Sequence, residues 1–198
     1  MGQFLFHVPL RGSVALVFMA STDYVDKKVQ HRGEFYALVL LSATGMMLLA
    51  ATRELISIYV SLELTALPLA ALAAFLGDSR SSEAGMKFLV LSAISSALLL
   101  YGMALVYGFT GTTYLADIAQ AVARSASDGP PFGSYALLMG GILMVAGFGF
   151  KIASVPFQMW VPDVYEGAPT PVTAFLSVTS KAAGFAILLR VFYVAFPS

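Results

Sequence analysis

The sequence contains no cysteine and few charged residues. Without cysteine, the 198 residues supply no thiolate ligands, which excludes thiolate-bound iron–sulfur clusters and zinc sites within this chain. Charged residues make up 11% of the sequence, against roughly 25% in an average soluble domain. The net charge is zero, so there is no electrostatic case for a nucleic-acid partner. A nucleotide-binding loop is absent too, because the glycine-containing stretch 147–151 lacks the Gly-Lys-Ser/Thr ending.

Long apolar runs take the place of these features. They cover Phe4–Ala20, Phe35–Thr52, Leu55–Leu76, Phe88–Gly111, Tyr135–Pro162 and Thr170–Phe196. A helix needs about 20 apolar residues to cross a bilayer, and all the runs meet that length except the first, which is shorter and contains Arg11. A buried soluble core would need helices with polar outer faces. We therefore predict an all-α integral membrane protein with about six transmembrane helices.

Basic residues are distributed unevenly between the loops. With the chain crossing sides at each segment, four lie in loops on one face and two on the other: Lys27, Lys28, Arg32 and Arg80 against Arg53 and Arg124. The positive-inside rule then places the first set in the cytoplasm or its organelle equivalent. The polar stretch Asp117–Pro131 is predicted to be a loop with a short surface helix before its Gly-Pro break.

Three ionisable residues lie deep inside predicted spans: Glu63, Lys151 and Lys181. A charge at the bilayer centre costs at least ~2.5–3.5 kcal/mol on insertion scales, so such residues usually face a bundle interior and often mark ion paths. Small residues share a helical face with each of them, which lets helices approach closely. These are Ala66, Ala70 and Ala74 for Glu63, Gly147 and Ser154 for Lys151, and Ala174, Ser177 and Gly184 for Lys181.

The alternative for these charges is purely structural, with ion pairs that hold the bundle together. Prolines favour the functional interpretation, since Pro156 follows Lys151 closely and Pro169 and Pro171 open the Lys181 segment. Broken helices beside buried charges are typical of ion pathways at the membrane midplane. Lys87 begins its segment and can extend to the interface, so structural and functional roles stay open for it.

One stretch resembles a known signature. The run from Val155 to Ala186 contains Val-Pro-Phe-Gln-Met-Trp-Val-Pro-Asp-Val-Tyr-Glu-Gly-Ala-Pro-Thr-Pro-Val-Thr-Ala-Phe-Leu-Ser. It is similar to subunit N of respiratory NADH:quinone oxidoreductase (complex I), called subunit 2 in mitochondria. The upstream runs Gly33-Glu-Phe-Tyr-Ala-Leu and Tyr59-Val-Ser-Leu-Glu-Leu-Thr-Ala-Leu-Pro68 resemble the same subunit. The resemblance extends from about His31 to the end.

The resemblance implies an antiporter-like fold, in which two inverted five-helix repeats each form a proton half-channel. Residues 31–198 match the first repeat, and residues 1–30 would be a partial N-terminal transmembrane segment with its cytoplasmic loop. The fifth segment would be broken near Pro156 and the sixth after its start. Glu63 matches the family's membrane glutamate, Lys151 the lysine on the first broken helix and Lys181 the central lysine. Lys87 falls where subunit N also has a lysine.

Two departures from the family stand out. Gln158 occupies a position where many relatives have histidine, so any histidine role there is absent. The second repeat has no counterpart in the sequence, so we expect a fragment, a truncated gene product or a split subunit. On its own, such a chain would lack the second half-channel and would not pump.

The resemblance implies a proton-translocating subunit of NADH:quinone oxidoreductase, bound to the other membrane subunits of complex I. NADH, FMN, iron–sulfur clusters and quinone would belong to those other subunits, with no cofactor in this chain. The expected location is a bacterial plasma membrane, with a mitochondrial inner or thylakoid membrane as alternatives. Two other functions stay open: a subunit of a sodium/proton antiporter or membrane-bound hydrogenase, and a scaffold segment that does not pump.

Overall fold

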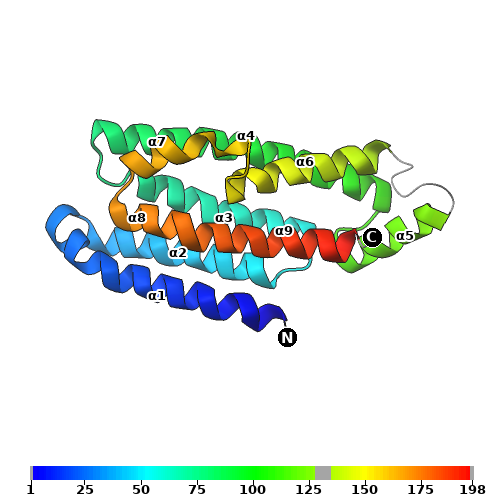
Figure 1. Cartoon of the computed structure of the whole chain (residues 1–198), viewed down its shortest axis with the longest axis horizontal. Helices are drawn as coiled ribbons and strands as arrows, with labels where there is room; N and C mark the ends of the chain where they lie inside the picture. Colours follow the sequence, from blue (N-terminus) through cyan, green and yellow to red (C-terminus); the bar gives the residue numbers. More distant parts are fainter. Residues whose placement is uncertain (1, 128–134, 197–198) are drawn as a thin grey trace.

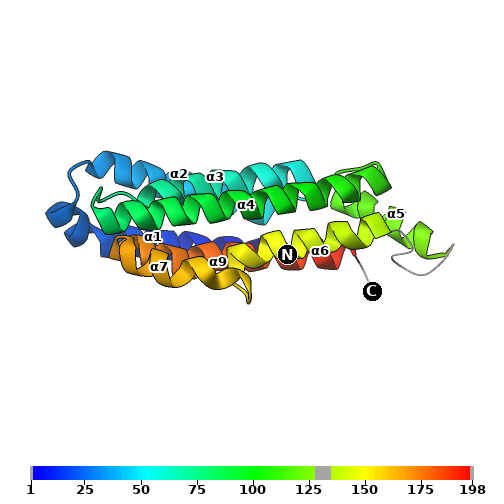
Figure 2. The ribbon, with the colours of Figure 1, turned by 90° about the horizontal axis from the view of Figure 1, so that it is seen from above.

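The computed structural model describes residues 2–127 and 135–196, and nearly all of them are helical. In chain order the elements are α1 (Gly2–Lys28), α2 (Arg32–Ala51), α3 (Leu55–Ala73), α4 (Ser79–Thr110), α5 (Leu115–Ser127), α6 (Tyr135–Ile152), the short 3₁₀ turn η1 (Phe157–Met159), α7 (Trp160–Gly167), α8 (Thr170–Phe175), the π-helical turn η2 (Leu176–Ser180) and α9 (Lys181–Ala195). The long helices run alternately up and down one elongated bundle (Figures 1 and 2).

Within the described residues, five helical segments are long and apolar enough to cross a membrane. They are α2, α3, α4, the combined stretch Tyr135–Gly167 and the combined stretch Thr170–Ala195. The all-α membrane fold is therefore confirmed. The one remaining expected span is the first in the chain, Phe4–Ala20. It lies within α1, which has 27 residues but is less apolar than the other spans and ends on Lys27 and Lys28. It packs along α2, α8 and α9.

The ends of the helices follow from local chemistry. Glu54 caps α3 by accepting a hydrogen bond from the Ser57 backbone N–H at 3.1 Å, and Asp78 caps α4 by accepting one from the Ser81 N–H at 2.7 Å. Gly111 ends α4 in the left-handed conformation at φ +71°, which glycine adopts without steric cost. The predicted surface helix is α5, and the Gly-Pro break expected after it lies outside the described residues.

The chain reversals place the loops at two ends of the bundle. The turn at 29–31 and the loop at 74–78 lie at one end, whereas the loop at 52–54 and α5 lie at the other (Figure 1). Lys28 and Arg80 therefore share one end, as the alternation of spans predicts. At the opposite end the Arg190 Nη1 donates a hydrogen bond to the Thr52 carbonyl at 3.0 Å and ties α9 to the α2–α3 loop.

The fifth span is broken near the middle of the bundle, as predicted. Helix α6 ends at Ile152, Ala153 takes a positive φ of 57°, and the chain restarts in η1 and α7 after Pro156. Proline lacks an N–H donor and disfavours helical geometry in the preceding residue, so Pro156 favours a break at this point. The Ser154 N–H instead donates to the Gly149 carbonyl at 2.9 Å. By contrast, Pro68 lies inside α3 without interrupting it.

The sixth span is also irregular, in the place that was predicted. The π-helical turn η2 lies between α8 and α9, and Lys181 is the first residue after it. Single π-helical turns inside α-helices occur frequently at functional sites, because the extra residue re-aims the side chains that follow.

Small residues allow the helices around these breaks to approach closely. A Cβ added to Gly85 on α4 would lie 2.5 Å from the Ala74 Cβ and 2.9 Å from the Ala70 carbonyl oxygen. A Cβ added to Gly147 on α6 would lie 2.6 Å from the Leu99 Cβ on α4. The predicted small-residue stripes of Glu63 and Lys151 therefore face α4, and they bring α3, α4 and α6 together around one interior.

Candidate functional site

The centre of the candidate site is Lys151. It is the second-last residue of α6, next to the break, and only 7% of its surface is exposed. The ammonium nitrogen is fully buried and has no hydrogen-bond partner among the described residues. A buried polar group is normally satisfied, and a charged one nearly always. The buried ammonium is therefore costly for the fold, which makes Lys151 the main candidate for a functional side chain.

A small cavity, lined by apolar side chains and by serine hydroxyls, adjoins Lys151. It has a volume of about 20 Å³, which is enough for about one water molecule. Three serines of α4 line it: Ser92, Ser95 and Ser96. The Ser95 hydroxyl donates to the Gly147 carbonyl at 3.0 Å, and the Ser92 hydroxyl donates to the Leu89 carbonyl at 2.9 Å. With their hydrogens used in this way, both hydroxyls offer only acceptor lone pairs to the cavity.

Glu63 supplies a negative charge from the neighbouring helix. It lies on α3, one of its carboxylate oxygens is buried without a hydrogen-bond partner, and its charge interacts with Lys151. No salt bridge within 4 Å joins the two side chains in the described part of the chain. The pair is thus close enough to interact through a low-dielectric interior but is not locked in contact.

Lys181 lies against the same region from α9. A Cβ on Gly184, one turn after Lys181, would lie 3.2 Å from the Lys151 Cγ, so the two lysine-bearing helices touch beside the break. The Lys181 side chain is partly buried, and its ammonium lies over the ring of Tyr165 at 5.6 Å from the centroid. Lys151 therefore interacts with Glu63 of α3, and its side chain lies against α9, the helix that begins with Lys181.

Aromatic side chains connect the two halves of the broken fifth span. The Trp160 Nε1 on α7 donates a hydrogen bond to the Phe150 carbonyl on α6 at 3.2 Å, across the break. The Trp160 ring also packs on Phe88, on Phe150 and edge-on against Tyr165. The break is therefore bridged by a defined contact, and α7 is held in place relative to Lys151.

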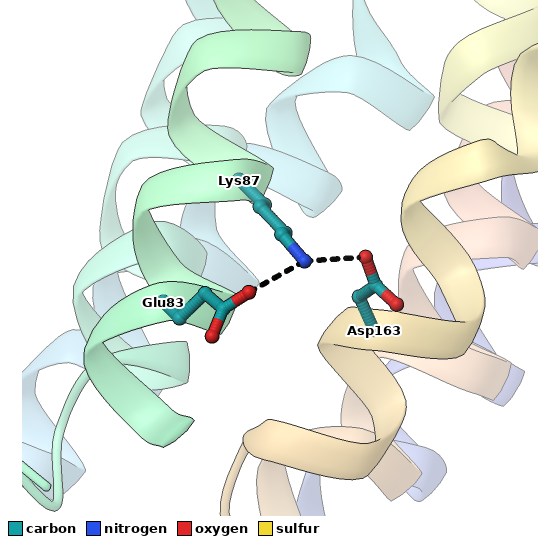
Figure 3. Close-up of polar contacts among 3 residues, drawn as sticks. All are labelled: Glu83, Lys87 and Asp163. Carbon is teal, nitrogen blue, oxygen red and sulfur yellow. Dashed lines mark hydrogen bonds and ion pairs between the residues drawn. The ribbon is translucent and has the colours of Figure 1, made fainter. Parts of the chain in front are cut away.

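Lys87 lies apart from this buried centre. Its ammonium contacts the Glu83 Oε1 and the Asp163 Oδ2, both at 2.7 Å, and so joins α4 to α7 (Figure 3). Its side chain is 41% exposed. Helix α4 begins at Ser79, earlier than the apolar run suggests, so Lys87 sits within the helix and not at its start. The structure gives Lys87 two carboxylate partners, whereas the Lys151 ammonium has none.

A surface groove and the arrangement of potential metal ligands complete the description of the site. A groove of about 540 Å³ between α3 and α4 is lined mainly by apolar side chains and shares no lining residue with the Lys151 cavity. Among residues 2–127 and 135–196, no group of three or more His, Cys, Asp or Glu side chains could hold a metal ion. The polar groups that the interior does offer are one carboxylate, two lysines and several hydroxyl groups.

The sequence did not single out Tyr165, Thr179 or the α4 serines. The Tyr165 hydroxyl and the Thr179 hydroxyl are both buried without a hydrogen-bond partner. The serines recur at positions 92, 95 and 96, which is a helical spacing that points toward one face. That spacing could have indicated a polar stripe on an otherwise apolar helix, but nothing local indicates that the stripe meets Lys151.

Comparisons with known proteins identify the family of the chain. Residues 52–198 match the family model for the transmembrane region of NADH:quinone oxidoreductase and Mrp antiporter proteins. A curated relative from Moorella thermoacetica, NADH-quinone oxidoreductase subunit N, is 55% identical over 92% of this chain. Subunit N of Dehalococcoides mccartyi is 49% identical over 91% of it. The chain spans only 37% of the length of each of these two relatives.

Solved structures show the same fold in membrane complexes. A chain of respiratory complex I from Thermus thermophilus, with bound aureothin, matches 90% of this chain at 41% identity and a TM-score of 0.73, over 39% of its own length. A chain of the archaeal membrane-bound sulfane sulfur reductase matches 92% at 29% identity and a TM-score of 0.77, over 36% of its own length. A chain of the Mrp complex from Dietzia matches 80% at 28% identity and a TM-score of 0.67, over 29% of its own length.

Proposed function

The chain belongs to the membrane family of NADH:quinone oxidoreductase and Mrp antiporter subunits, and we propose that it forms a proton half-channel of subunit N in a bacterial NADH:quinone oxidoreductase. On this proposal it is the first antiporter-like repeat of that subunit, in the plasma membrane. Its partners are the other membrane subunits of the complex, which also carry the NADH, FMN, iron–sulfur and quinone chemistry.

The observation that carries the proposal is the buried, unpartnered ammonium of Lys151 beside a helix break. A lysine held without a fixed counter-ion can gain and lose a proton, whereas a lysine locked to a carboxylate stays charged. Glu63 stabilises the protonated state when its carboxylate is near. Lys181, on the helix that touches Lys151 at Gly184, is the next acceptor along the membrane. Quinone reduction in other subunits would drive this exchange.

The fold alone does not separate this function from its relatives. The sulfane sulfur reductase and Mrp chains superpose on it about as well as the complex I chain does. Sequence identity favours the subunit N assignment, since it is 41% to the complex I chain against 29% and 28% to the others.

The decisive experiment replaces Lys181 with arginine in the full-length subunit within the complex. Arginine keeps the positive charge and still stacks on an aromatic ring, but it does not release a proton in proteins. We expect Lys181→Arg to lower proton translocation in sealed vesicles at least about tenfold, nearly as far as Lys181→Met does. Lys28→Met is the matched control, because that lysine lies over the Tyr24 ring at the end of α1.

Two further variants complete the test. Lys151→Met removes the charge at similar side-chain length, and it is preferable to arginine because the 20 Å³ cavity offers little room for a guanidinium group. Glu63→Gln should lower proton pumping and coupled quinone reduction while the complex still assembles. Wild-type pumping in an assembled Lys181→Arg complex would remove Lys181 from the pathway. Loss of assembly in all three variants would favour the scaffold function.

A further inference from the structure

We infer that Tyr165 is a positioning residue for Lys181: its ring face holds the Lys181 ammonium and so couples the two broken spans. This inference rests on the proposed function, because it assigns a role in the same proton pathway. Tyr165 lies on α7, which is the second half of the broken fifth span. Lys181 is the first residue after the π-helical turn of the broken sixth span.

The contact has the geometry of a cation–π interaction. The Lys181 Nζ lies 5.6 Å from the centre of the Tyr165 ring, within the distance of about 6 Å at which the ring quadrupole attracts a cation. No carboxylate lies within 4 Å of this ammonium among the described residues. Among the charged groups on neighbouring helices, Lys151 on α6 has its side chain against α9 at Gly184, and Glu63 on α3 interacts electrostatically with Lys151.

One contact holds the Tyr165 ring and another holds its backbone. The ring packs edge-on against Trp160, with ring centres 6.0 Å apart, and Trp160 is itself bonded to the Phe150 carbonyl across the helix break. The Tyr165 carbonyl oxygen accepts a hydrogen bond from the Thr173 hydroxyl on α8 at 3.3 Å. A movement of Lys151 at the end of α6 can therefore reach Lys181 through one continuous set of contacts.

The hydroxyl group of Tyr165 does not explain why a tyrosine stands here. It is buried and has no hydrogen-bond partner, so it costs free energy without offering a contact. The ring face is the part of the side chain that meets a charged group. This points to the aromatic ring, and not the phenol oxygen, as the functional element.

A neutral aromatic partner suits a lysine that must release its proton. In a low-dielectric interior a carboxylate in contact would hold the ammonium strongly and resist deprotonation. A ring attracts the cation more weakly and leaves no uncompensated anion when the proton departs. Cation–π contacts occur about once per 70–80 residues, so proximity alone indicates little. Another such contact among the described residues, Lys28 over Tyr24 at 5.1 Å, lies at the end of α1 and serves as a comparison.

The test compares Tyr165→Phe, Tyr165→Leu and the control Tyr24→Leu in the full-length subunit of the assembled complex. The measurement is proton translocation in sealed vesicles as a function of pH. Tyr165→Phe keeps the ring face and should stay within about twofold of wild type at every pH. Tyr165→Leu removes the ring, so the alkaline fall in pumping should move about 0.5–1 pH unit to lower pH. Tyr24→Leu should leave the profile unchanged.

A second series protects the test against a variant that does not assemble. Phenylalanine with increasing fluorination at position 165 keeps the shape of the ring while it weakens the negative ring face. The alkaline fall should then move stepwise with each added fluorine, and the same series at the buried Phe35 should have no effect. A flat response at position 165, or a Tyr165→Phe variant as impaired as Tyr165→Leu, would overturn the inference. Inactive Lys181 variants beside an unaffected Tyr165 series would leave the proposed function intact.

Discussion

The packing of α6 on α4 next to Lys151 can be tested by adding one methyl group. In Gly147→Ala the new Cβ would lie 2.6 Å from the Leu99 Cβ and 3.2 Å from the Ser95 carbonyl oxygen. Ordinary carbon contacts begin near 3.4 Å, so the two helices must separate by about 0.8 Å. The Ser95 hydroxyl bond to the Gly147 carbonyl, 3.0 Å in the structure, would lengthen with them.

The expected loss of stability follows from these two effects. Overpacking of a tight interior costs about 1–3 kcal/mol, and loss of one buried hydrogen bond costs about 1 kcal/mol. Alanine gains about 0.5–1 kcal/mol over glycine within a helix. We therefore expect Gly147→Ala to lower the free energy of unfolding by about 1–3 kcal/mol.

Gly141→Ala is the matched control on the same helix. A Cβ at Gly141 meets no atom within 4 Å, so this variant should gain only the helix preference of alanine. The difference between the two variants cancels that preference and should be about 2–4 kcal/mol. Chemical unfolding of the purified chain in detergent gives both values, with the fluorescence of Trp160, the one tryptophan in the sequence, as the probe. Equal stabilities for the two variants would refute the close packing of α4 on α6.

Two further predictions concern the ends of the bundle. Hydrogen bonds from the Ser57 side chain and backbone hold the pKa of Glu54 below its ordinary value near 4.5. The α3 cap is therefore fully formed above that value and is lost as the pH falls through the lowered pKa. Acid should then destabilise the wild-type protein more steeply than the Glu54→Gln variant, which unfolding midpoints measured between about pH 6 and pH 3 would show. Parallel curves for the two proteins would contradict this prediction. The end of the bundle with Lys28 should face the cytoplasm and α5 the far side; cysteines introduced at Lys28 and Asp117 can be probed with an impermeant thiol reagent, and labelling at Lys28 from outside intact cells would reverse the assignment.

Much of the fold follows from one-dimensional patterns. Apolar runs of membrane length predict the spans, and Pro156 predicts the break in the fifth span, because each depends only on neighbouring residues. The surface helix before the Gly-Pro break was predicted in the same way and is α5. The first apolar run is short and contains Arg11, and α1, the helix that contains it, is not among the five described stretches that are apolar enough to span a membrane.

The sequence predicted which residues belong to the candidate site but not which side chains they contact. Glu63, Lys151 and Lys181 stand out because ionisable residues are rare in apolar spans. Their partners depend on helix packing, which no local pattern specifies. Glu63 and Lys151 form no salt bridge within 4 Å in the described residues. Lys87 instead bridges two carboxylates from different helices.

The sequence by itself determined that this chain crosses a membrane, where its helices break and which charges they carry inside, because hydrophobic length, proline geometry and the cost of a buried charge act locally. Only the tertiary structure decided that the α4 serines face Lys151, that Gly184 brings α9 against α6, and that the Tyr165 ring lies under the Lys181 ammonium. These contacts join residues far apart in the chain or on different helices. They depend on crossing positions and side-chain directions that no local pattern specifies.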